Sequence, residues 1–220
     1  MSTSEPLILA FDTSAAHCAA ALLSGERILA SAWEPMGKGQ AERLMPLVAE
    51  VVAEGGVALS DLDAIGVGIG PGNFTGIRIS VSAARGLALA LGRPAVGVSL
   101  LEALAWGARE PVLAAIDARR DHVYLQRFGE DCGRGPELVS LGECSGLAAP
   151  GLTVTGDRAD EIAARLGANL RQAPDNPAPA IARITATRFD AADLPRPAPL
   201  YLRPADAAPA RDGGPVILPR

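Results

Sequence analysis

The sequence predicts an α/β protein of two lobes, with mixed sheets and flanking helices, and three observations predict it. The chain opens with three apolar strand patterns, helices and strands alternate from Gln40, and a second strand-led unit begins at Val112. Helices that alternate with strands cover the faces of a sheet, whereas consecutive strands joined by tight turns pair antiparallel. We therefore expect an N-terminal lobe at residues 1–110, a smaller C-terminal lobe at 111–190, and a Pro-rich tail at 191–220 that lies partly on the body.

The elements of the first lobe follow from its hydrophobic periodicity. Leu7–Phe11 is a continuous apolar run typical of a buried strand, and residues 17–23 and 27–33 are its expected antiparallel neighbours. Gln40–Glu54 has apolar residues at helical spacing and stops at a pair of glycines. The other elements expected in this lobe are a strand at 64–69, a helix at 75–91, a strand at 95–98 and a helix at 100–109.

The second lobe starts with a strand at 112–116, whose expected hairpin partner is His122–Phe128. After Gly129 the pattern weakens, and we expect a short strand at 153–155 and helices at 158–166 and 180–189. From Ala191 onward prolines are frequent and apolar periodicity is weak, which predicts an extended tail with a disordered end.

Composition and charge limit the partners. The 220 residues carry a net charge of −5, and Lys38 is the only lysine. Nucleic-acid binding needs Lys and Arg clustered on one face, and the arginines of this chain are scattered. We therefore expect no autonomous binding of tRNA.

Cysteine usage and the N-terminus indicate the compartment. Cys18, Cys132 and Cys144 are too few for a disulfide framework and lack CxxC spacing, so we expect reduced structural thiols and no zinc site. The short acidic N-terminus has no signal-peptide pattern, and no apolar run reaches the roughly 18 residues of a membrane helix. We expect a cytoplasmic protein without membrane contact.

The stretch Gly66–Ile79 runs from an apolar strand through a glycine-proline turn into a helix that Asn73 or Thr75 caps. Glycine lacks the Cβ that keeps a backbone or a ligand at a distance. The turn therefore either cradles a phosphate at the helix N-terminus or packs the helix tightly onto the sheet. Neither the GxGxxG fingerprint nor the P-loop pattern occurs.

A second polar segment, Asp12-Thr13-Ser14, directly follows the first strand. Asp12 could hold a metal-bound water while Thr13 and Ser14 bind phosphate, or the segment is an ordinary cap that bonds to local backbone. Spacing by itself favours the cap. The candidate nucleotide-binding residues are Asp12, Thr13, Ser14, Gly70 and Gly72.

The sequence contains no convincing catalytic constellation. His17 and His122 are the only histidines, each in a strand pattern without a carboxylate at ligand spacing, and no GxSxG nucleophile motif occurs. Asp117, Arg119 and Asp121 either form surface ion pairs or line a cleft. We expect no catalytic residue and no metal ligand.

Two helices have surfaces suited to close packing. The helix at 75–91 is rich in Ala, Gly and Ser, which let another helix approach closely, and Gln40–Glu54 has a wide apolar stripe. Either a second helix pair docks on them from outside, or both helices stack on the core of their own lobe. Composition does not choose between these alternatives.

Five motifs occur in a fixed order along the chain. They are LAFDTS at 9–14, GIGPGNFTGIR at 68–78, SLLEAL at 99–104, IDARR at 116–120 and PLYLR at 199–203. Together they resemble the bacterial TsaB (YeaZ) family, which acts in making threonylcarbamoyladenosine in tRNA. The resemblance is close over residues 7–128 and rests on the last motif beyond them.

This resemblance implies an actin-like, hsp70-like ATPase (ASKHA) fold with a reduced second lobe. It also implies a role beside TsaD, the larger paralogue that carries the catalytic metal, in modifying tRNAs that read codons beginning with adenine. Where TsaD has a Val-Asn-His-x-Glu-Gly-His metal motif, this chain has Leu100 and Leu104 at the two histidine positions. Leucine cannot coordinate a metal, so the resemblance implies a non-catalytic partner rather than an enzyme.

The resemblance further implies the assembly. It implies a heterodimer with TsaD through the first two long helices, a homodimer when TsaD is absent, and the small ATPase TsaE joining the complex. ATP or ADP is implied only within that complex, and TsaC supplies the threonylcarbamoyl-adenylate. The expected interface residues are Leu44, Leu47, Val51, Ile77, Val81, Ala84 and Ala88.

Two other functions are alternatives at this stage. One is a metal-dependent glycopeptidase, an older interpretation of this superfamily that Leu100 and Leu104 disfavour. The other is a nucleotide-binding sensor that uses residues 12–14 and the turn at 68–72. Such a sensor would need phosphate contacts from a complete second lobe.

Overall fold

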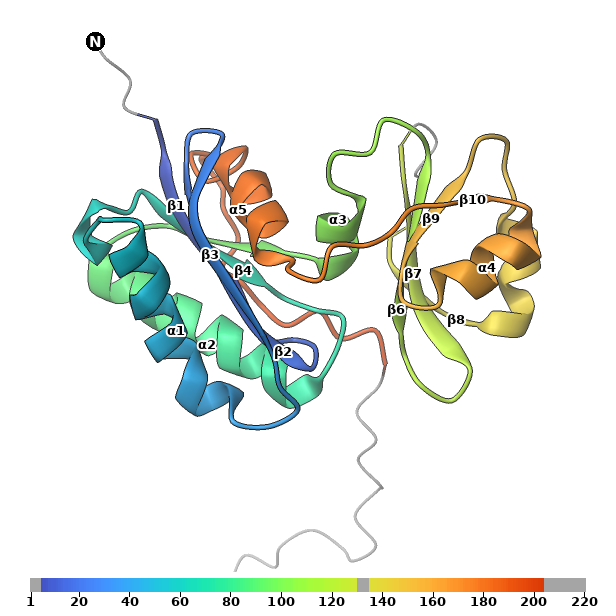
Figure 1. Ribbon diagram of the computed structural model, residues 1–220, viewed down its shortest axis with the longest axis horizontal. Coiled ribbons are helices and arrows are strands. Elements are labelled where there is room, and N and C mark those ends of the chain that lie inside the picture. Colours follow the sequence, from blue (N-terminus) through green and yellow to red (C-terminus); the bar gives the residue numbers. More distant parts are fainter. Residues whose placement is uncertain (1–4, 130–134, 204–220) are drawn as a thin grey trace, which may run out of the picture.

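Two five-stranded sheets organise the computed structural model, which describes residues 5–129 and 135–203 (Figure 1). The first sheet has the strand order β3-β2-β1-β4-β5, and the second has the order β10-β9-β6-β7-β8. Each sheet mixes parallel and antiparallel pairs. The predicted two-lobed α/β architecture with mixed sheets is confirmed.

The first sheet is built around a strand that is buried on both faces. Its strands are β1 (Leu7–Asp12), β2 (His17–Ser24), β3 (Arg27–Pro35), β4 (Ala64–Gly68) and β5 (Ala95–Val98). β1 pairs antiparallel with β2 and parallel with β4. A central strand covered on both faces needs a continuous apolar run, and Ile8 to Phe11 are fully buried.

Helices cover both faces of this sheet (Figure 1). One face carries α1 (Gln40–Glu54) and α2 (Phe74–Leu91), and the other carries α5 (Ala178–Ala186), which packs on β1, β2 and β4. Asn73 caps α2, because its side-chain oxygen accepts the N–H groups of Thr75 and Gly76. The cap fixes the start of α2 at the end of the glycine turn.

The second sheet has helices mainly on its outer side. Its strands are β6 (Val112–Asp117), β7 (His122–Phe128), β8 (Glu137–Ser140), β9 (Thr153–Gly156) and β10 (Asn169–Leu170). The outer helices are α4 (Ala159–Leu166) and the 3₁₀ segment η2 (Leu141–Leu147), and a second 3₁₀ turn, η1 (Leu59–Asp61), lies in the first lobe. The short β8, β10, η1 and η2 were not expected, since elements of two to seven residues carry little periodicity.

Helix α3 (Leu100–Ala105) lies between the two sheets (Figure 1). It is shorter than the expected 100–109, because Trp106 leaves helical geometry with a ψ of 134° and Gly107 follows with a positive φ of 76°. The core that contains α3 draws on both sheets, through Ile8, Val98 and Ala114, and on α5, through Ile181. The two lobes therefore share a packed core.

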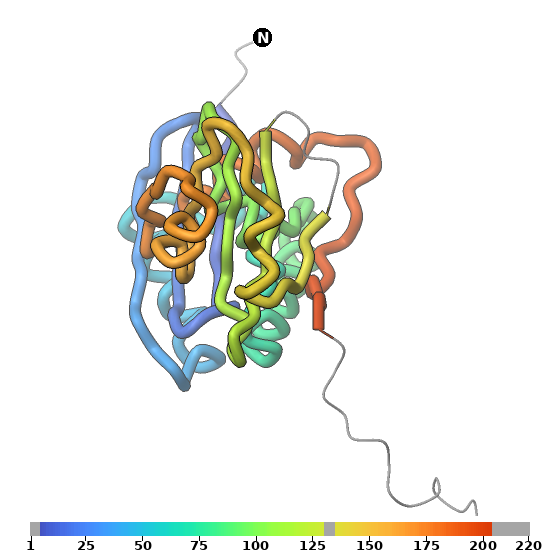
Figure 2. Tube along the Cα trace, turned by 90° about the vertical axis from the view of Figure 1, so that its right-hand side faces the viewer, coloured from blue at the N-terminus to red at the C-terminus, as the bar shows by residue number. Residues whose placement is uncertain are grey.

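The chain returns to the first lobe before its end. The expected second lobe, residues 111–190, differs from the structure in its last helix, because α5 packs on the first sheet. After α5 the chain is extended and runs along the side of the molecule, where the Leu200 N–H donates to the Ile69 carbonyl at 2.9 Å (Figure 2). Among the described residues after α5, up to residue 203, the chain has no further helix or strand. Its predicted disordered end and Cys132 lie outside the described residues.

The expectation that no segment is apolar enough for a membrane helix is wrong for α2. Phe74–Leu91 is long and apolar enough to cross a membrane by length and composition, and it is the one such helix among the described residues. One helix of this kind is weak evidence, since a core helix passes the same test. Ile77, Val81 and Ala84 of α2 are buried in the core of the first lobe.

Candidate functional site

A buried polar cluster lies at the carboxyl end of β1. The Asp12 Oδ2 atom accepts the N–H and Oγ–H of Ser14 at 3.0 and 2.9 Å, and it lies 2.7 Å from His17 Nε2. Asp12 and Ser14 are fully buried, and His17 is 8% exposed. Among the described residues, Asp12 Oδ1 has no hydrogen-bond partner. A buried carboxylate with this many contacts organises the loop around it.

The glycine turn packs directly against this loop. A Cβ added to Gly68 would lie 1.9 Å from Asp12 Oδ1, and one added to Gly72 would lie 2.2 Å from the Ser14 carbonyl oxygen. Contacts this short exclude any side chain, so only glycine permits the observed approach. The turn was expected either to cradle a phosphate or to pack tightly, and the structure shows it packed tightly on the loop after β1.

The N–H groups that a phosphate would need are already bonded. The Asn73 N–H donates to the Ser14 carbonyl at 2.6 Å, and the Thr75 and Gly76 N–H groups donate to Asn73 Oδ1. Thr13 is fully buried, and its hydroxyl donates to the Gly76 carbonyl at 2.7 Å. A phosphate needs exposed donors at a helix N-terminus.

The residues predicted to bind nucleotide therefore do not fit a phosphate in this conformation. Asp12, Thr13 and Ser14 are buried, and the Gly70 carbonyl accepts the Leu100 N–H at 2.8 Å. Gly72 is exposed, but the nearby Thr75 N–H already donates to the Asn73 side chain. The sequence does not reveal how closely the turn packs on residues 12–14, and nucleotide binding within a larger complex stays a prediction.

Gln40 ties the start of α1 to the same loop. Its Nε2 atom donates to the carbonyl oxygens of Thr13, Ala15 and His17 at 3.2, 2.6 and 2.9 Å. Sequence reasoning missed both Gln40 and the contact of His17 with Asp12. A signal for His17 existed, because Asp12 pairs with Ala19 and alternate strand residues share a face.

The position that corresponds to the TsaD metal motif is closed. Leu100 is 6% exposed, Leu104 packs on the core between the sheets, and the Glu102 carboxylate pairs with Arg188. Among the described residues, no group of three or more His, Cys, Asp or Glu side chains could hold a metal. These residues do not fit a TsaD-type metal, because two apolar side chains stand where nitrogen ligands are needed.

The structure corrects the prediction of which residues form the interface. Six of the seven form the core of the first lobe with exposed fractions of 3% or less, and they are Leu44, Leu47, Val51, Ile77, Val81 and Ala84. Ala88 is half-buried against the same core. The apolar stripe that was assigned to a partner packs on the chain's own sheet.

The outer faces of α1 and α2 are exposed instead. Met45 of α1 is 41% exposed and Leu89 of α2 is 87% exposed. Small residues lie beside them, including Ala49 on α1 and Gly86 on α2, where a Cβ on Gly86 would meet nothing within 4 Å. This face is open and suited to close approach by another helix.

An exposed aromatic and cationic cluster marks the start of α2. The Arg78 guanidinium carbon lies 3.8 Å from the centroid of the Phe74 ring, and Arg78 Nε donates to the Tyr201 hydroxyl at 2.8 Å. The Phe74 and Tyr201 rings stack with centroids 5.1 Å apart. Phe74 and Tyr201 are each 46% exposed. The extended tail thus supplies one of the three members of this cluster.

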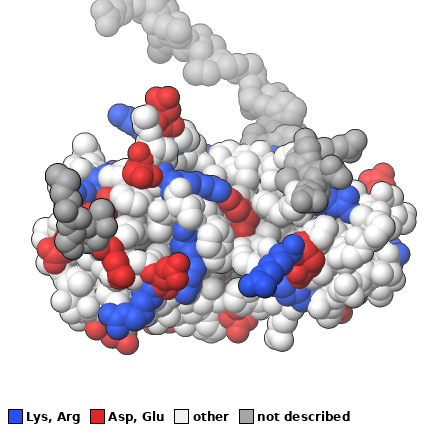
Figure 3. All heavy atoms as spheres, turned by 90° about the horizontal axis from the view of Figure 1, so that it is seen from above, with Lys and Arg blue, Asp and Glu red and all other residues white. Residues whose placement is uncertain are grey.

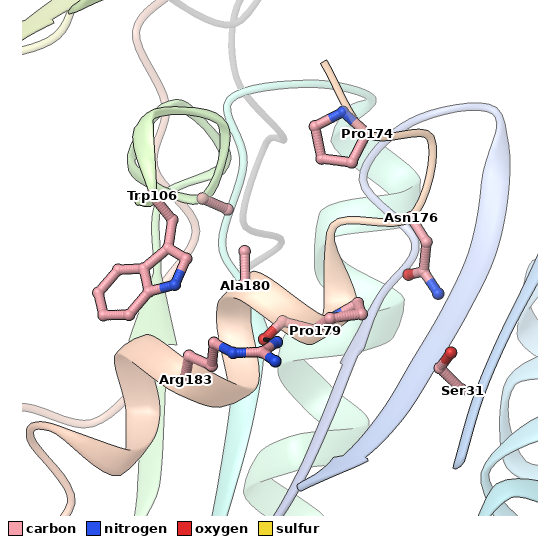
Figure 4. Close-up of a pocket in the computed structure, with 8 residues that line it drawn as sticks. Ser31, Trp106, Pro174, Asn176, Pro179, Ala180 and Arg183 are labelled. Atoms are coloured by element: carbon pink, nitrogen blue, oxygen red, sulfur yellow. Dashed lines mark hydrogen bonds between the residues drawn. The ribbon is translucent and has the colours of Figure 1, made fainter. Parts of the chain in front are cut away.

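A cavity of about 380 Å³ lies elsewhere, between α3, α5 and β3 (Figure 4). Trp106, Pro174 and Pro179 give it apolar walls, and Arg183 is its one charged lining residue. The Arg183 guanidinium donates to the carbonyls of Pro179 and Glu26, both at 3.4 Å. None of the predicted site residues lines this cavity.

Neighbouring charges and burial shift the pKa values of several groups. Hydrogen bonds from Arg43 hold the pKa values of Glu34 and Glu50 below their usual range. Burial, followed by the nearby Glu34 carboxylate, raises the pKa of the Cys18 thiol to about 11. On the face shown in Figure 3, positive and negative side chains are interspersed, which gives no massed basic patch there.

Fold comparison identifies the class of protein. Component A of (R)-2-hydroxyglutaryl-CoA dehydratase from Acidaminococcus fermentans superposes with a TM-score of 0.55 over 84% of this chain and 99% of that one. The sequence identity is 11%, so this similarity concerns the fold. The chain has the actin-like ATPase (ASKHA) fold, as predicted.

Sequence comparison identifies the family. The family model of TsaD, tRNA N6-adenosine threonylcarbamoyltransferase, matches residues 34–198. The structure of YeaZ from Pseudomonas aeruginosa is 33% identical and superposes with a TM-score of 0.72 over 90% of this chain and all of that one. The chain carries a TsaD-type domain and belongs to the TsaB (YeaZ) family.

Two curated relatives show how far the similarity extends. The TsaB protein of Escherichia coli, a tRNA threonylcarbamoyladenosine biosynthesis protein, is 39% identical over 129 residues, which are 56% of this chain and 55% of that protein. An uncharacterised protein of Mycobacterium tuberculosis is 35% identical over 92% of this chain and 94% of its own length. The match to the Escherichia coli protein thus spans about half of its length.

Proposed function

We propose that this chain acts in the formation of threonylcarbamoyladenosine in tRNA as a non-catalytic partner of TsaD. Its membership of the TsaB (YeaZ) family supports the pathway. The observation that carries the non-catalytic role is the closed metal position, where Leu100 and Leu104 replace histidines and Glu102 is held by Arg188. We therefore assign this chain a binding role beside a metal enzyme and no catalytic role.

The outer face of α1 and α2 is the proposed contact with TsaD. The residues first expected there are buried, and the exposed ones proposed in their place include the apolar Met45 and Leu89. Exposed apolar side chains surrounded by small residues are typical of a surface that a partner covers. The same face would support a homodimer when TsaD is absent.

The remaining parts of the proposal follow the family. TsaE joins the TsaD heterodimer, ATP or ADP binds only within that complex, and the modified tRNAs read codons beginning with adenine. This chain makes no autonomous contact with tRNA, which its net charge of −5 supports. The complex is cytoplasmic.

Co-purification with TsaD from the same organism tests the proposed contact. Leu89→Glu places a charge on the outer face of α2, and Leu170→Glu places one on β10, where Leu170 is 58% exposed. Burying an unpaired charge in a contact costs about 2–5 kcal/mol. We expect the first variant to lose TsaD and the matched control to retain it, with equal melting temperatures. Equal retention of TsaD by both variants would contradict this interface.

A further inference from the structure

The exposed side of α2 has a particular chemistry. Five exposed residues at helical spacing form what we call the α2 stripe: Phe74, Arg78, Ser82, Arg85 and Leu89. Residues three, four and seven positions apart lie on one side of a helix, so these side chains form a continuous row. The stripe contains two cations and no acid, and α2 as a whole has no acidic residue.

Neither arginine of the stripe has a charged partner within the described part of the chain. Other arginines pair with carboxylates, including Arg43 with Glu34 and Glu50, and Arg165 with Glu161. Arg78 and Arg85 form no such pair there, although both are exposed. Their guanidinium donors are therefore available to another molecule.

Arg78 is also held in place. Its guanidinium lies over the Phe74 ring at 3.8 Å, and its Nε is bound by the Tyr201 hydroxyl at 2.8 Å. Tyr201 is positioned by the extended tail, because the preceding Leu200 N–H donates to Ile69. A guanidinium fixed on one edge loses less conformational entropy when it binds, and its remaining donors match a carboxylate.

We propose that Arg78, oriented by Phe74 and Tyr201, is the anchor that binds a carboxylate of the partner protein on the α2 stripe. This inference rests on the proposed function, in which that partner is TsaD. The stripe favours an acidic partner over a second copy, because two copies of α2 meeting face to face would bring four arginines together. Arginine and aromatic side chains are also the usual hot spots of protein interfaces.

The same stripe suits a protein better than RNA. Phosphate binding needs many cations, and Arg78 and Arg85 are about 10 Å apart along the helix axis, with apolar Phe74 and Leu89 at the two ends of the stripe. The net charge of −5 also opposes RNA binding. We therefore propose a protein as the partner of the stripe, and the experiment below also measures RNA binding.

Titration calorimetry of the full chain with purified TsaD tests the anchor. Arg78→Met removes the guanidinium, Arg78→Lys keeps only the charge, and Tyr201→Phe removes only the hydroxyl that orients Arg78. We expect affinity losses of about 30-fold or more, about 10-fold, and about 3-fold respectively. Arg109→Met, which changes another exposed arginine, is the control and should bind within about 2-fold of wild type.

The outcomes separate the anchor from the proposed function. If wild type binds TsaD and Arg78→Met binds equally well with an unchanged melting temperature, the anchor is wrong and the proposed function stands. If wild type does not bind TsaD, both the proposed function and the proposed role of Arg78 are wrong. Loss of self-association or of tRNA binding in Arg78→Met, with TsaD binding unchanged, would assign the stripe to a second copy or to RNA and overturn the proposal.

Discussion

The backbone of Gly76 lies so close to Thr13 that a Cβ added to Gly76 would stand 1.9 Å from the Thr13 carbonyl oxygen. The Thr13 hydroxyl in turn donates to the Gly76 carbonyl at 2.7 Å. This contact locks the first turn of α2 onto the loop after β1. The glycine motif is therefore explained by packing, because the loop occupies the space that a ligand would need.

Gly76→Ala should destabilise the fold strongly, since its Cβ would collide with backbone rather than with a flexible side chain. We expect a loss of about 2–4 kcal/mol in the free energy of unfolding, measured by urea denaturation. Gly86→Ala is the matched control in the same helix, where a Cβ meets nothing within 4 Å. It should stabilise the protein by about 0.5–1 kcal/mol. Equal effects of the two substitutions would contradict the packing account.

Gln40 should contribute to stability through its three carbonyl contacts. Gln40→Met leaves these carbonyls without their donor and should cost about 1–3 kcal/mol in thermal or chemical unfolding. Gln40→Glu should cost more, because it places a carboxylate against carbonyl oxygens in a buried position. A Glu variant as stable as wild type would show that Gln40 does not bind this loop in solution.

Cys18 should be unreactive in the folded protein. Burial and the Glu34 carboxylate raise its pKa to about 11, so the thiol stays protonated at pH 8 and a thiol reagent should label it only on unfolding. The unfolded thiol ionises at its ordinary pKa of 9.0, whereas the folded thiol ionises only at its raised pKa of about 11. The stabilising effect is therefore complete below pH 9 and is lost as the pH rises towards 11, by about 2 kcal/mol.

Cys18→Ala is the control for that pH dependence, because it should remove this part of the alkaline loss of stability. Chemical denaturation between pH 8 and pH 11 measures the difference. Rapid labelling of Cys18 at pH 8 under native conditions, in a variant with the other two cysteines replaced by serine, would show that the thiol is accessible.

The isolated chain should bind adenine nucleotides very weakly. Asp12, Thr13 and Ser14 are fully buried, and the donors at the start of α2 are already bonded. Calorimetry with ATP and Mg²⁺ should give a Kd above about 1 mM. A Kd near 10 μM or tighter, on the order of a 100-fold difference, would require the glycine turn to open and would favour the nucleotide-sensor alternative.

Much of the fold is predictable from the sequence, because long elements carry strong periodicity. The ends of α1 and the pairing of β6 with β7 follow from local pattern and turn residues. The return of α5 to the first sheet does not, since it depends on contacts between α5 and β1, whose residues are more than 160 positions apart. Local hydrophobic periodicity does not predict such long-range contacts.

The candidate site was less predictable than the fold. The apolar stripe of α1 and α2 is the face that a helix buries in its own core, and Leu47 and Val81 show this outcome. The residues that stay exposed on these helices mix apolar and polar side chains, such as Leu89 and Arg85, and periodicity does not distinguish them from ordinary surface. The cluster at Arg78 joins residues 123 positions apart, so only the path of the tail reveals it.

Reconstitution of tRNA modification from purified TsaD, TsaC and TsaE, with and without this chain, tests the central claim most directly. The measured quantity is threonylcarbamoyladenosine formed in tRNA, by mass spectrometry. We expect modification only when the chain is present, and no modification when the chain replaces TsaD. Full modification without the chain, or modification by the chain in the absence of TsaD, would contradict the account.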